Sequence, residues 1–152
     1  MHTFNREYKQ FLLLVIIVIT IDQISKYILS INLDFFLNKT LFIFSFNYLQ
    51  NYGAAFNIFE GNRIFLSSIS IFSSLALIYF IFFKERLIPL DRYGLSLILA
   101  GSLGNGIDRI IKGYVIDFIS LKLFDFPVFN IADIAINIGC IILIFNYFRF
   151  KK

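Results

Sequence analysis

The chain has 152 residues, of which 59% are hydrophobic and only 16% are charged, and its mean hydropathy is +0.79. A soluble domain of this size could not hide so much apolar surface, because a large part of any small fold stays exposed, and the low hydrophobicity typical of disorder is absent. The bilayer is therefore the expected solvent; the formal net charge of +4 is interpreted as a topology signal, and a nucleic-acid partner has no support.

Four stretches are long and apolar enough to cross a bilayer, since about 20 helical residues span the hydrocarbon core. We expect these spans at residues 11–31, 64–83, 93–111 and 131–148. The first resembles a signal peptide, but no small-residue cleavage site follows it, and Asp22 and Lys26 continue the helical stretch. The sequence thus predicts an all-α membrane protein with four transmembrane helices, organised as one domain over residues 1–152.

The orientation in the membrane follows from the basic residues. Arg6 and Lys9 precede the first span, three basic residues lie in the short connection of residues 84–92, and three more close the chain at residues 149–152. Cytoplasmic loops are enriched in Lys and Arg. Both termini are therefore expected in the cytoplasm, and the two longer connections on the outer side.

Aromatic residues take every second position in part of the first outer connection. This alternation would place Phe42, Phe44, Phe46 and Tyr48 on one face of a strand. We expect a small extracytoplasmic β-sheet lying on the membrane surface as a platform. The aromatic face could sit at the level of the lipid headgroups, or the strand could be an ordinary half-buried one.

The inventory of reactive side chains excludes several kinds of site. Cys140, inside the fourth span, is the only cysteine, and His2 is the only histidine. One thiol cannot form an internal disulfide or a cysteine metal cluster, and a lone terminal histidine makes a Ser-His or Cys-His nucleophile and a histidine metal site untenable. Chemistry would have to use carboxylates, Lys, Ser or Tyr.

Ionisable residues inside membrane spans are functional candidates by default. Asp22 lies about half way along the first span, and Lys26 follows one helical turn later. An acid four residues before a base is the favoured helical pair. A structural ion pair and a contact with substrate both remain open for these two residues.

The third span becomes polar near its outer end. Asp108 has Lys112 at i+4, which favours a structural pair. Asn105 and Arg109 form a second i, i+4 pair on the same helix. Near the outer face, the Arg109 guanidinium could instead hold a phosphate or a carbonyl oxygen.

Asp117 and Asp133 differ from Asp22 and Asp108 because no base occupies their helical neighbour positions. Asp117 lies just beyond the third span and Asp133 opens the fourth, so both are expected near the outer interface. Two carboxylates brought together in a low-dielectric site share one proton, which is the working state of an aspartic protease. The alternatives are a solvated loop acid for Asp117 and, for Asp133, a capping box with Asn130.

Five blocks of the sequence together resemble one known family. In chain order they are Asp22-Gln23-x-x-Lys26; Asn51-x-Gly53-Ala54-Ala55-Phe56; Gly101-x-x-Gly104-Asn105-x-x-Asp108-Arg109; Gly113-x-Val115-x-Asp117-Phe118; and Phe126-Pro127-x-Phe129-Asn130-x-Ala132-Asp133. The order and spacing resemble lipoprotein signal peptidase, the bacterial type II signal peptidase. Ala100, where the family is expected to have a glycine, and Ile134, where a small or hydroxyl residue is usual, depart from it without changing a polar group.

The resemblance implies a specific activity: cleavage of diacylglyceryl-modified prolipoproteins just before the lipidated cysteine, at the outer face of the cytoplasmic membrane. It implies that Asp117 and Asp133 form the catalytic pair. It also implies that the substrate is contacted by Asn51, Asn105, Arg109 and Asn130. Asp22 and Lys26 would form a supporting polar pair. It implies no metal or cofactor. We expect a monomer whose partners are lipid-modified prolipoproteins and membrane lipids.

Two other classes of function fit the sequence less well. A small transporter or proton-coupled subunit would also keep charged residues within its spans, but it predicts broken helices in matching halves, and the sequence shows no internal repeat. A purely structural membrane subunit predicts polar residues without register, which the five blocks contradict.

Overall fold

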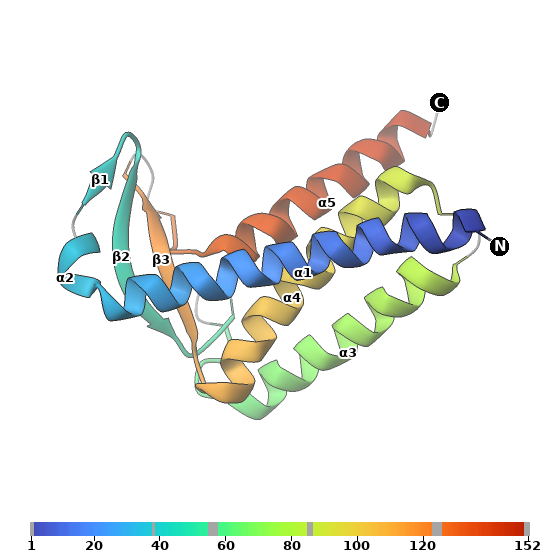
Figure 1. Cartoon of the computed structure of the whole chain (residues 1–152). Helices are drawn as coiled ribbons and strands as arrows, with labels where there is room; N and C mark the ends of the chain where they lie inside the picture. Colours follow the sequence, from blue (N-terminus) through green and yellow to red (C-terminus); the bar gives the residue numbers. More distant parts are fainter. Residues whose placement is uncertain (1, 38, 55–57, 85–86, 123–125, 151–152) are drawn as a thin grey trace.

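The computed structural model describes residues 2–37, 39–54, 58–84, 87–122 and 126–150 (Figure 1). Its helices are α1 (His2–Ile31), α2 (Leu33–Phe36), α3 (Arg63–Phe83), α4 (Pro89–Ile111) and α5 (Ile131–Phe150), and its strands are β1 (Thr40–Leu41), β2 (Phe44–Asn51) and β3 (Val115–Leu121). Ala55 and Phe56 of the second block, and Arg86, Lys151 and Lys152 of the basic clusters, lie outside the described residues.

Three of the long helices, α1, α3 and α5, have the length and apolar character needed to cross a membrane within the described part of the chain. The third predicted span is also helical, as α4, but it is not among them. The physical reason is its position, since α4 contacts α1, α3 and α5. A helix enclosed by others can present small and polar side chains where an outer helix must present apolar ones.

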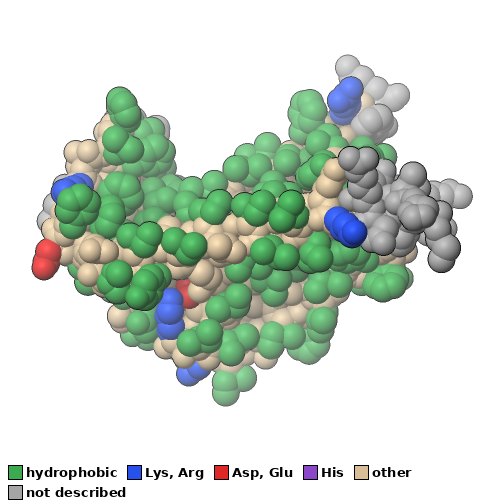
Figure 2. All heavy atoms as spheres, in the orientation of Figure 1, with side chains coloured by type: hydrophobic (Ala, Val, Ile, Leu, Met, Phe, Trp, Pro, Cys, Tyr) green, Lys and Arg blue, Asp and Glu red, His purple; other side chains and the backbone are tan. Residues whose placement is uncertain are grey.

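The outer helices carry their apolar side chains on the surface. Figure 2 shows hydrophobic side chains covering most of the visible face over the helices, with few charges between them. Ile16, Phe72 and Ile141, on α1, α3 and α5, are all at least half exposed. Such a surface is far too apolar for water and fits a hydrocarbon solvent.

Helices α4 and α5 approach each other through glycines. A Cβ on Gly101 would come within 2.3 Å of the carbonyl oxygen of Ala132, and one on Gly139 within 2.5 Å of that of Gly94. Small residues at helix interfaces allow this close backbone contact in membranes. The contact between Gly101 and Ala132 brings the polar end of α4 against the first turn of α5.

A three-stranded antiparallel sheet in the order β1-β2-β3 stands at one end of the helices, and both termini lie at the other end (Figure 1). The predicted strand is present as β2, and Phe46 and Tyr48 pack into a cluster with Leu29 and Phe118. The prediction was wrong for Phe42, which lies in the turn between β1 and β2 with a positive φ of 54° and is 92% exposed. The chain reverses there instead of continuing one extended strand.

Strand β3 was not predicted, and it decides where the two acids lie. It pairs with β2, with Leu49 opposite Asp117, and a bridge joins Ile119 to Phe129. The backbone N–H of Phe129 donates to the carbonyl of Ile119 at 2.9 Å. The segment that leads into α5 is thereby held against β3, so Asp117 is a buried strand residue and the solvated-loop alternative is wrong.

Candidate active site

The two predicted acids meet through one intermediate residue, Asn130. Its side-chain Nδ2 donates to Oδ1 of Asp117 at 2.6 Å, and its backbone N–H donates to Oδ2 of Asp133 at 3.0 Å. Asp117 comes from β3 and Asp133 from the first turn of α5. The structure thus brings together two residues that are 16 positions apart in the sequence.

Asn130 and Asp133 also form the predicted capping box. The backbone N–H of Asp133 donates to Oδ1 of Asn130 at 3.0 Å, which reciprocates the bond from the Asn130 N–H to the Asp133 carboxylate. Such boxes satisfy N–H groups that have no partner within the helix. Asp133 can therefore cap the helix and also belong to the site, because the capping bonds fix the rotation of its carboxylate.

The remaining carboxylate oxygens are held by two more asparagines. Nδ2 of Asn51 donates to Oδ2 of Asp117, and Nδ2 of Asn105 donates to Oδ1 of Asp133, each at 2.8 Å. Each of the four oxygens thus accepts one bond from a neutral amide. Among the described residues, neither carboxylate forms a salt bridge. Neutral donors orient the two acids without supplying the positive charge that would lock both in the ionised form.

Burial gives Asp117 an unusual proton affinity. Its removal from water, and secondarily the negative charge of Asp133, raise the pKa of the Asp117 carboxyl to about 6, against the opposing hydrogen bonds from Asn51 and Asn130. A carboxyl with this pKa can hold or release a proton at near-neutral pH. The negative charge of Asp133 thus favours the protonated form of Asp117, as like charges in one site do.

Both acids line one cavity of about 450 Å³. Its polar lining comprises Asn51, Ser70, Ser73, Ser102, Asn105, Arg109, Asp117, Asp133 and Asn137, and its apolar lining includes Ile69, Val115, Phe126, Phe129 and Ile136. The serine hydroxyls were missed by sequence reasoning, because scattered serines within spans give no motif. An apolar cavity with a few convergent polar groups is typical of a ligand site.

Arg109 reaches the cavity from the last turn of α4. Its Nη2 donates to the carbonyl of Gly53 at 3.0 Å, while its buried Nε has no hydrogen-bond partner among the described residues. The predicted i, i+4 partner Asn105 instead bonds Asp133 and Lys26. A guanidinium with an unused N–H can donate a hydrogen bond to an additional oxygen ligand.

Lys26 lies at the centre of a buried ionic cluster behind the acids. Its Nζ contacts Oδ2 of Asp22 at 2.8 Å, Oδ2 of Asp108 at 2.9 Å and Oδ1 of Asn105 at 3.0 Å. Lys112 pairs with the other oxygen of Asp108 at 2.9 Å. The predicted ion pairs Asp22–Lys26 and Asp108–Lys112 are confirmed, and they merge into one cluster that touches the site through Asn105.

Two further residues support this arrangement, and sequence reasoning gave neither of them a role. Gln23 donates to the Asp22 carboxylate and to the carbonyl of Gly104, at 3.1 and 3.2 Å. Arg63, at the start of α3, donates to the carbonyls of Arg109 and Ile110 at the end of α4. The position of Gln23 in the first sequence block could have indicated its role. Nothing near Arg63 indicates its partners, which lie more than 45 residues away in the sequence.

Replacing Arg109 with lysine tests the use of its guanidinium. Arg109→Lys keeps the charge but removes the forked donor geometry, so kcat/KM for the peptidase activity that the sequence resemblance implies should fall by roughly ten- to a hundredfold. The thermal midpoint in detergent should change little. Arg63→Lys is the matched control, since Arg63 also donates to backbone carbonyls but does not line the cavity; it should lower the midpoint more than kcat/KM. Equal kcat/KM for Lys and Arg at position 109 would show that only the charge matters.

The chain is similar to several known proteins. The family model for signal peptidase (SPase) II matches residues 14–149. Proteins named lipoprotein signal peptidase from Microcystis aeruginosa and Lactobacillus johnsonii are 39% and 42% identical to the chain, covering 93% and 92% of it and 94% and 92% of their own lengths. Two solved structures of a bacterial membrane enzyme, both obtained by the in meso method, superpose with TM-scores of 0.81 and 0.80 at 33% and 32% identity. They cover 93% and 91% of this chain and 88% and 92% of their own.

Proposed function

The chain belongs to the signal peptidase II family, and from this premise we propose that it removes signal peptides from lipoprotein precursors with Asp117 and Asp133 as its catalytic pair. The observation that carries the assignment is the pair itself: two carboxylates without a salt bridge to any described residue, held by neutral amides in one cavity. Such a pair can carry one proton and exchange it during hydrolysis of a peptide bond.

The proposed reaction uses a water molecule placed between the two carboxyl groups. The ionised carboxylate takes a proton from the water while the water oxygen adds to the scissile carbonyl carbon. The protonated carboxyl group donates its proton to the carbonyl oxygen. The tetrahedral intermediate then collapses as the C–N bond breaks. One of its hydroxyl groups gives a proton to the ionised carboxylate, and the leaving nitrogen takes the proton of the other carboxyl group, which restores the singly protonated pair. The two acids act as a unit, so the protonation states belong to the pair and not to either residue.

The neighbouring polar residues are proposed to orient the pair and the substrate. Asn51, Asn105 and Asn130 fix the carboxylates, as their bonds to Asp117 and Asp133 support. Arg109 holds a carbonyl or lipid oxygen with its unused N–H, and Asp22 with Lys26 supports the site from behind. The proposed substrates are prolipoproteins bearing a diacylglyceryl group, cut just before the lipidated cysteine.

The proposed setting is the bacterial cytoplasmic membrane. The chain forms one domain over residues 1–152 that acts as a monomer among membrane lipids, and α4 is its fourth span because it lies within the other three helices. The basic residues beside the termini support a cytoplasmic location for both ends. The sheet lies at the opposite end (Figure 1), so the pair would act at the outer face.

The activity is tested with matched substrates and purified protein in detergent. A diacylglyceryl-modified precursor should be cut before its lipidated cysteine, whereas the same precursor without the lipid should be cut far more slowly. Depletion of the protein in its own cell should make the lipidated precursor accumulate in the membrane. Equal cleavage of both precursors would contradict the assignment of a lipidated substrate.

The topology is tested with reporter fusions at three positions. A reporter after Lys152, or within the connection of residues 84–92, should report a cytoplasmic location, because basic residues gather there. A reporter near Asn38 should report the outside. A cytoplasmic result at Asn38 would place the acids on the wrong side and contradict the proposed site of action.

A further inference from the structure

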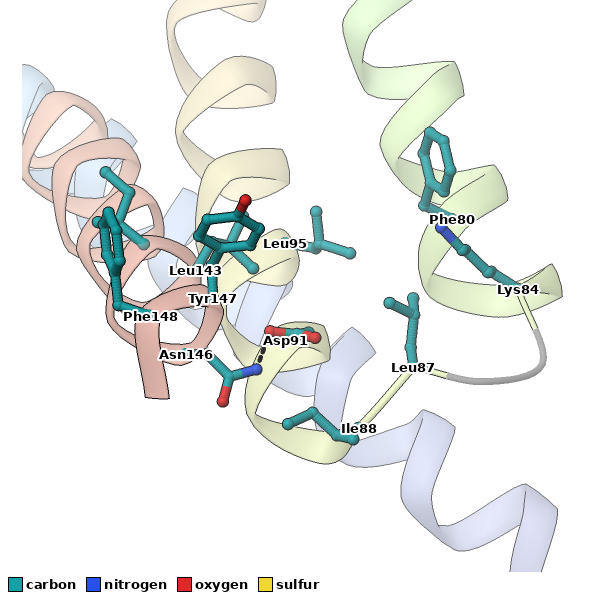
Figure 3. A pocket seen from close by; sticks show the side chains of 11 residues that line it. Phe80, Lys84, Leu87, Ile88, Asp91, Leu95, Leu143, Asn146, Tyr147 and Phe148 are labelled. Carbon is teal, nitrogen blue, oxygen red and sulfur yellow. Dashed lines mark hydrogen bonds between the residues drawn. The ribbon is translucent and has the colours of Figure 1, made fainter. Parts of the chain in front are cut away.

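A second cavity lies at the end of the bundle that carries both termini, between the last turns of α3 and α5 and the first turns of α4 (Figure 3). Its volume of about 820 Å³ falls within the range typical of ligand sites. It shares no lining residue with the cavity of the two aspartates. The proposed peptidase reaction therefore gives this cavity no role.

The cavity is apolar along its walls and charged where the helices end. Phe80 on α3, Leu95 on α4 and Leu143 on α5 form apolar walls toward the middle of the bundle. Lys84 and Asp91 lie where α3 ends and α4 begins, on opposite sides of the space (Figure 3). This order, with charges at the helix ends and apolar groups deeper, is the order in which a membrane lipid presents its headgroup and chains.

The acidic side of the cavity is formed by a hydrogen-bonded polar pair. Asn146 is only 5% exposed, and its Nδ2 donates to Oδ1 of Asp91 at 2.6 Å. This bond orients the Asp91 carboxylate at the wall of the cavity, whereas Oδ1 of Asn146 is buried and points away from Asp91 (Figure 3). A ligand that carries N–H donors and a positive charge would complement the carboxylate.

Each charged residue also has a simpler explanation. Asp91 in the first turn of α4 complements the helix dipole, and Lys84 lies 5.1 Å from the centre of the Phe80 ring. Neither explanation requires the cation and the anion to face one cavity from opposite sides.

We propose that this cavity binds a zwitterionic membrane phospholipid whose headgroup ends in a primary ammonium. Lys84 contacts the lipid phosphate as a point charge, and the ammonium donates to the Asp91 carboxylate. The upper acyl chains lie against Phe80, Leu95 and Leu143. A quaternary ammonium has no N–H to donate, and an anionic headgroup would bring negative charge toward Asp91, so the site distinguishes headgroups.

The test is a comparison of three lipids with the same dioleoyl chains, added to delipidated full-length protein in detergent and quantified by native mass spectrometry. Phosphatidylethanolamine should bind roughly tenfold more tightly than phosphatidylcholine or phosphatidylglycerol, as a charge-assisted hydrogen bond predicts. Asp91→Asn should remove this preference, and Lys84→Gln should weaken binding of all three lipids. Lys122→Gln, at an exposed lysine after β3, is the matched control and should change nothing.

Equal binding of the three lipids to the parent protein, or stronger binding of phosphatidylglycerol, would overturn the proposal. So would an Asp91→Asn variant that keeps the preference. Precursor cleavage should be unchanged in these variants, which shows that they are folded. Should Asp91→Asn fail to fold, Ile144→Trp supplies the second test: the residue is 57% exposed and lines the cavity. The larger side chain should narrow the space and weaken headgroup-selective binding, and unchanged selectivity would count against the site.

Discussion

Asp117→Asn and Asp133→Asn should each lower kcat/KM for cleavage of a lipidated precursor by roughly a thousandfold or more, because neither proton abstraction nor proton donation survives with one carboxylate. Asparagine keeps the size and part of the hydrogen bonding of each side chain, so the variants should remain folded. The measurement is the single-turnover rate in detergent, together with the thermal midpoint. The double variant should be hardly slower than either single one, since the two acids act as a unit.

A matched control separates this effect from a general change of charge. Asp34→Asn, at an exposed acid on α2, makes the same chemical change near the same end of the molecule and should leave the rate unchanged. The rate of the parent should follow a bell-shaped pH profile, with limbs that belong to the pair. Substantial activity in a folded Asp117 or Asp133 variant would show that the pair is misassigned, and Asp108 would be the next candidate.

The pH dependence of stability gives an independent measure of the Asp117 environment. Its pKa is raised to about 6 from an ordinary value of 3.8, chiefly by burial. The folded state therefore binds this proton more tightly than the unfolded state, so this group's contribution is fully favourable below pH 3.8 and is lost as pH rises through 6. The thermal midpoint of Asp117→Asn relative to the parent should accordingly increase between pH 4 and pH 7. A difference that does not change with pH would show that the carboxyl is not perturbed.

Local patterns in the sequence predicted the outer helices α1, α3 and α5 well because the membrane imposes a length and a composition on each of them, whereas the short helix α2 was not predicted. They predicted α4 as a helix too, but its sequence is less apolar because other helices surround it. The spacing of Asp22 and Lys26 predicted their ion pair, and Asn130 three residues before Asp133 predicted the capping box. These are contacts between neighbours on one helix, which sequence spacing encodes directly.

The contacts that assemble the site could not be predicted from spacing, because they join distant segments. Strand β3 pairs with a strand more than 60 residues earlier, and nothing near Asp117 indicates that pairing. The bond from Lys26 to Asn105 spans 79 positions. The resemblance to a family implied that these residues belong to one site without giving their contacts, such as the bonds from Asn130 to both acids.

The buried ionic cluster carries the second large expected effect. Lys26→Met should lower the free energy of unfolding by about 3–5 kcal/mol, because removing one partner leaves an uncompensated charge out of water. Lys26 is fully buried and contacts both Asp22 and Asp108, and with Lys112 the cluster sums to zero charge. The loss should appear as a lower thermal midpoint and a lower yield of folded protein in detergent.

Lys112→Met is the matched control for this prediction. The Lys112 side chain is 32% exposed, and Asp108 would keep Lys26 as its partner. The loss should therefore be about 1 kcal/mol or less, as for partly exposed pairs. A Lys26→Met variant that is as stable as Lys112→Met would show that the buried charges are compensated in another way.

The double variant Asp22→Asn with Lys26→Met then separates support of the fold from support of the site. Removing both charges should recover part of the lost stability, since Asp108 keeps Lys112 and no unpaired charge remains at position 22. Asn105, however, would still lack the Lys26 bond that fixes its amide toward Asp133. We therefore expect recovered stability with a kcat that stays below that of the parent and an unchanged KM. Recovery of both stability and kcat would mean that the pair supports the fold alone, and a raised KM would instead indicate direct contact with the substrate.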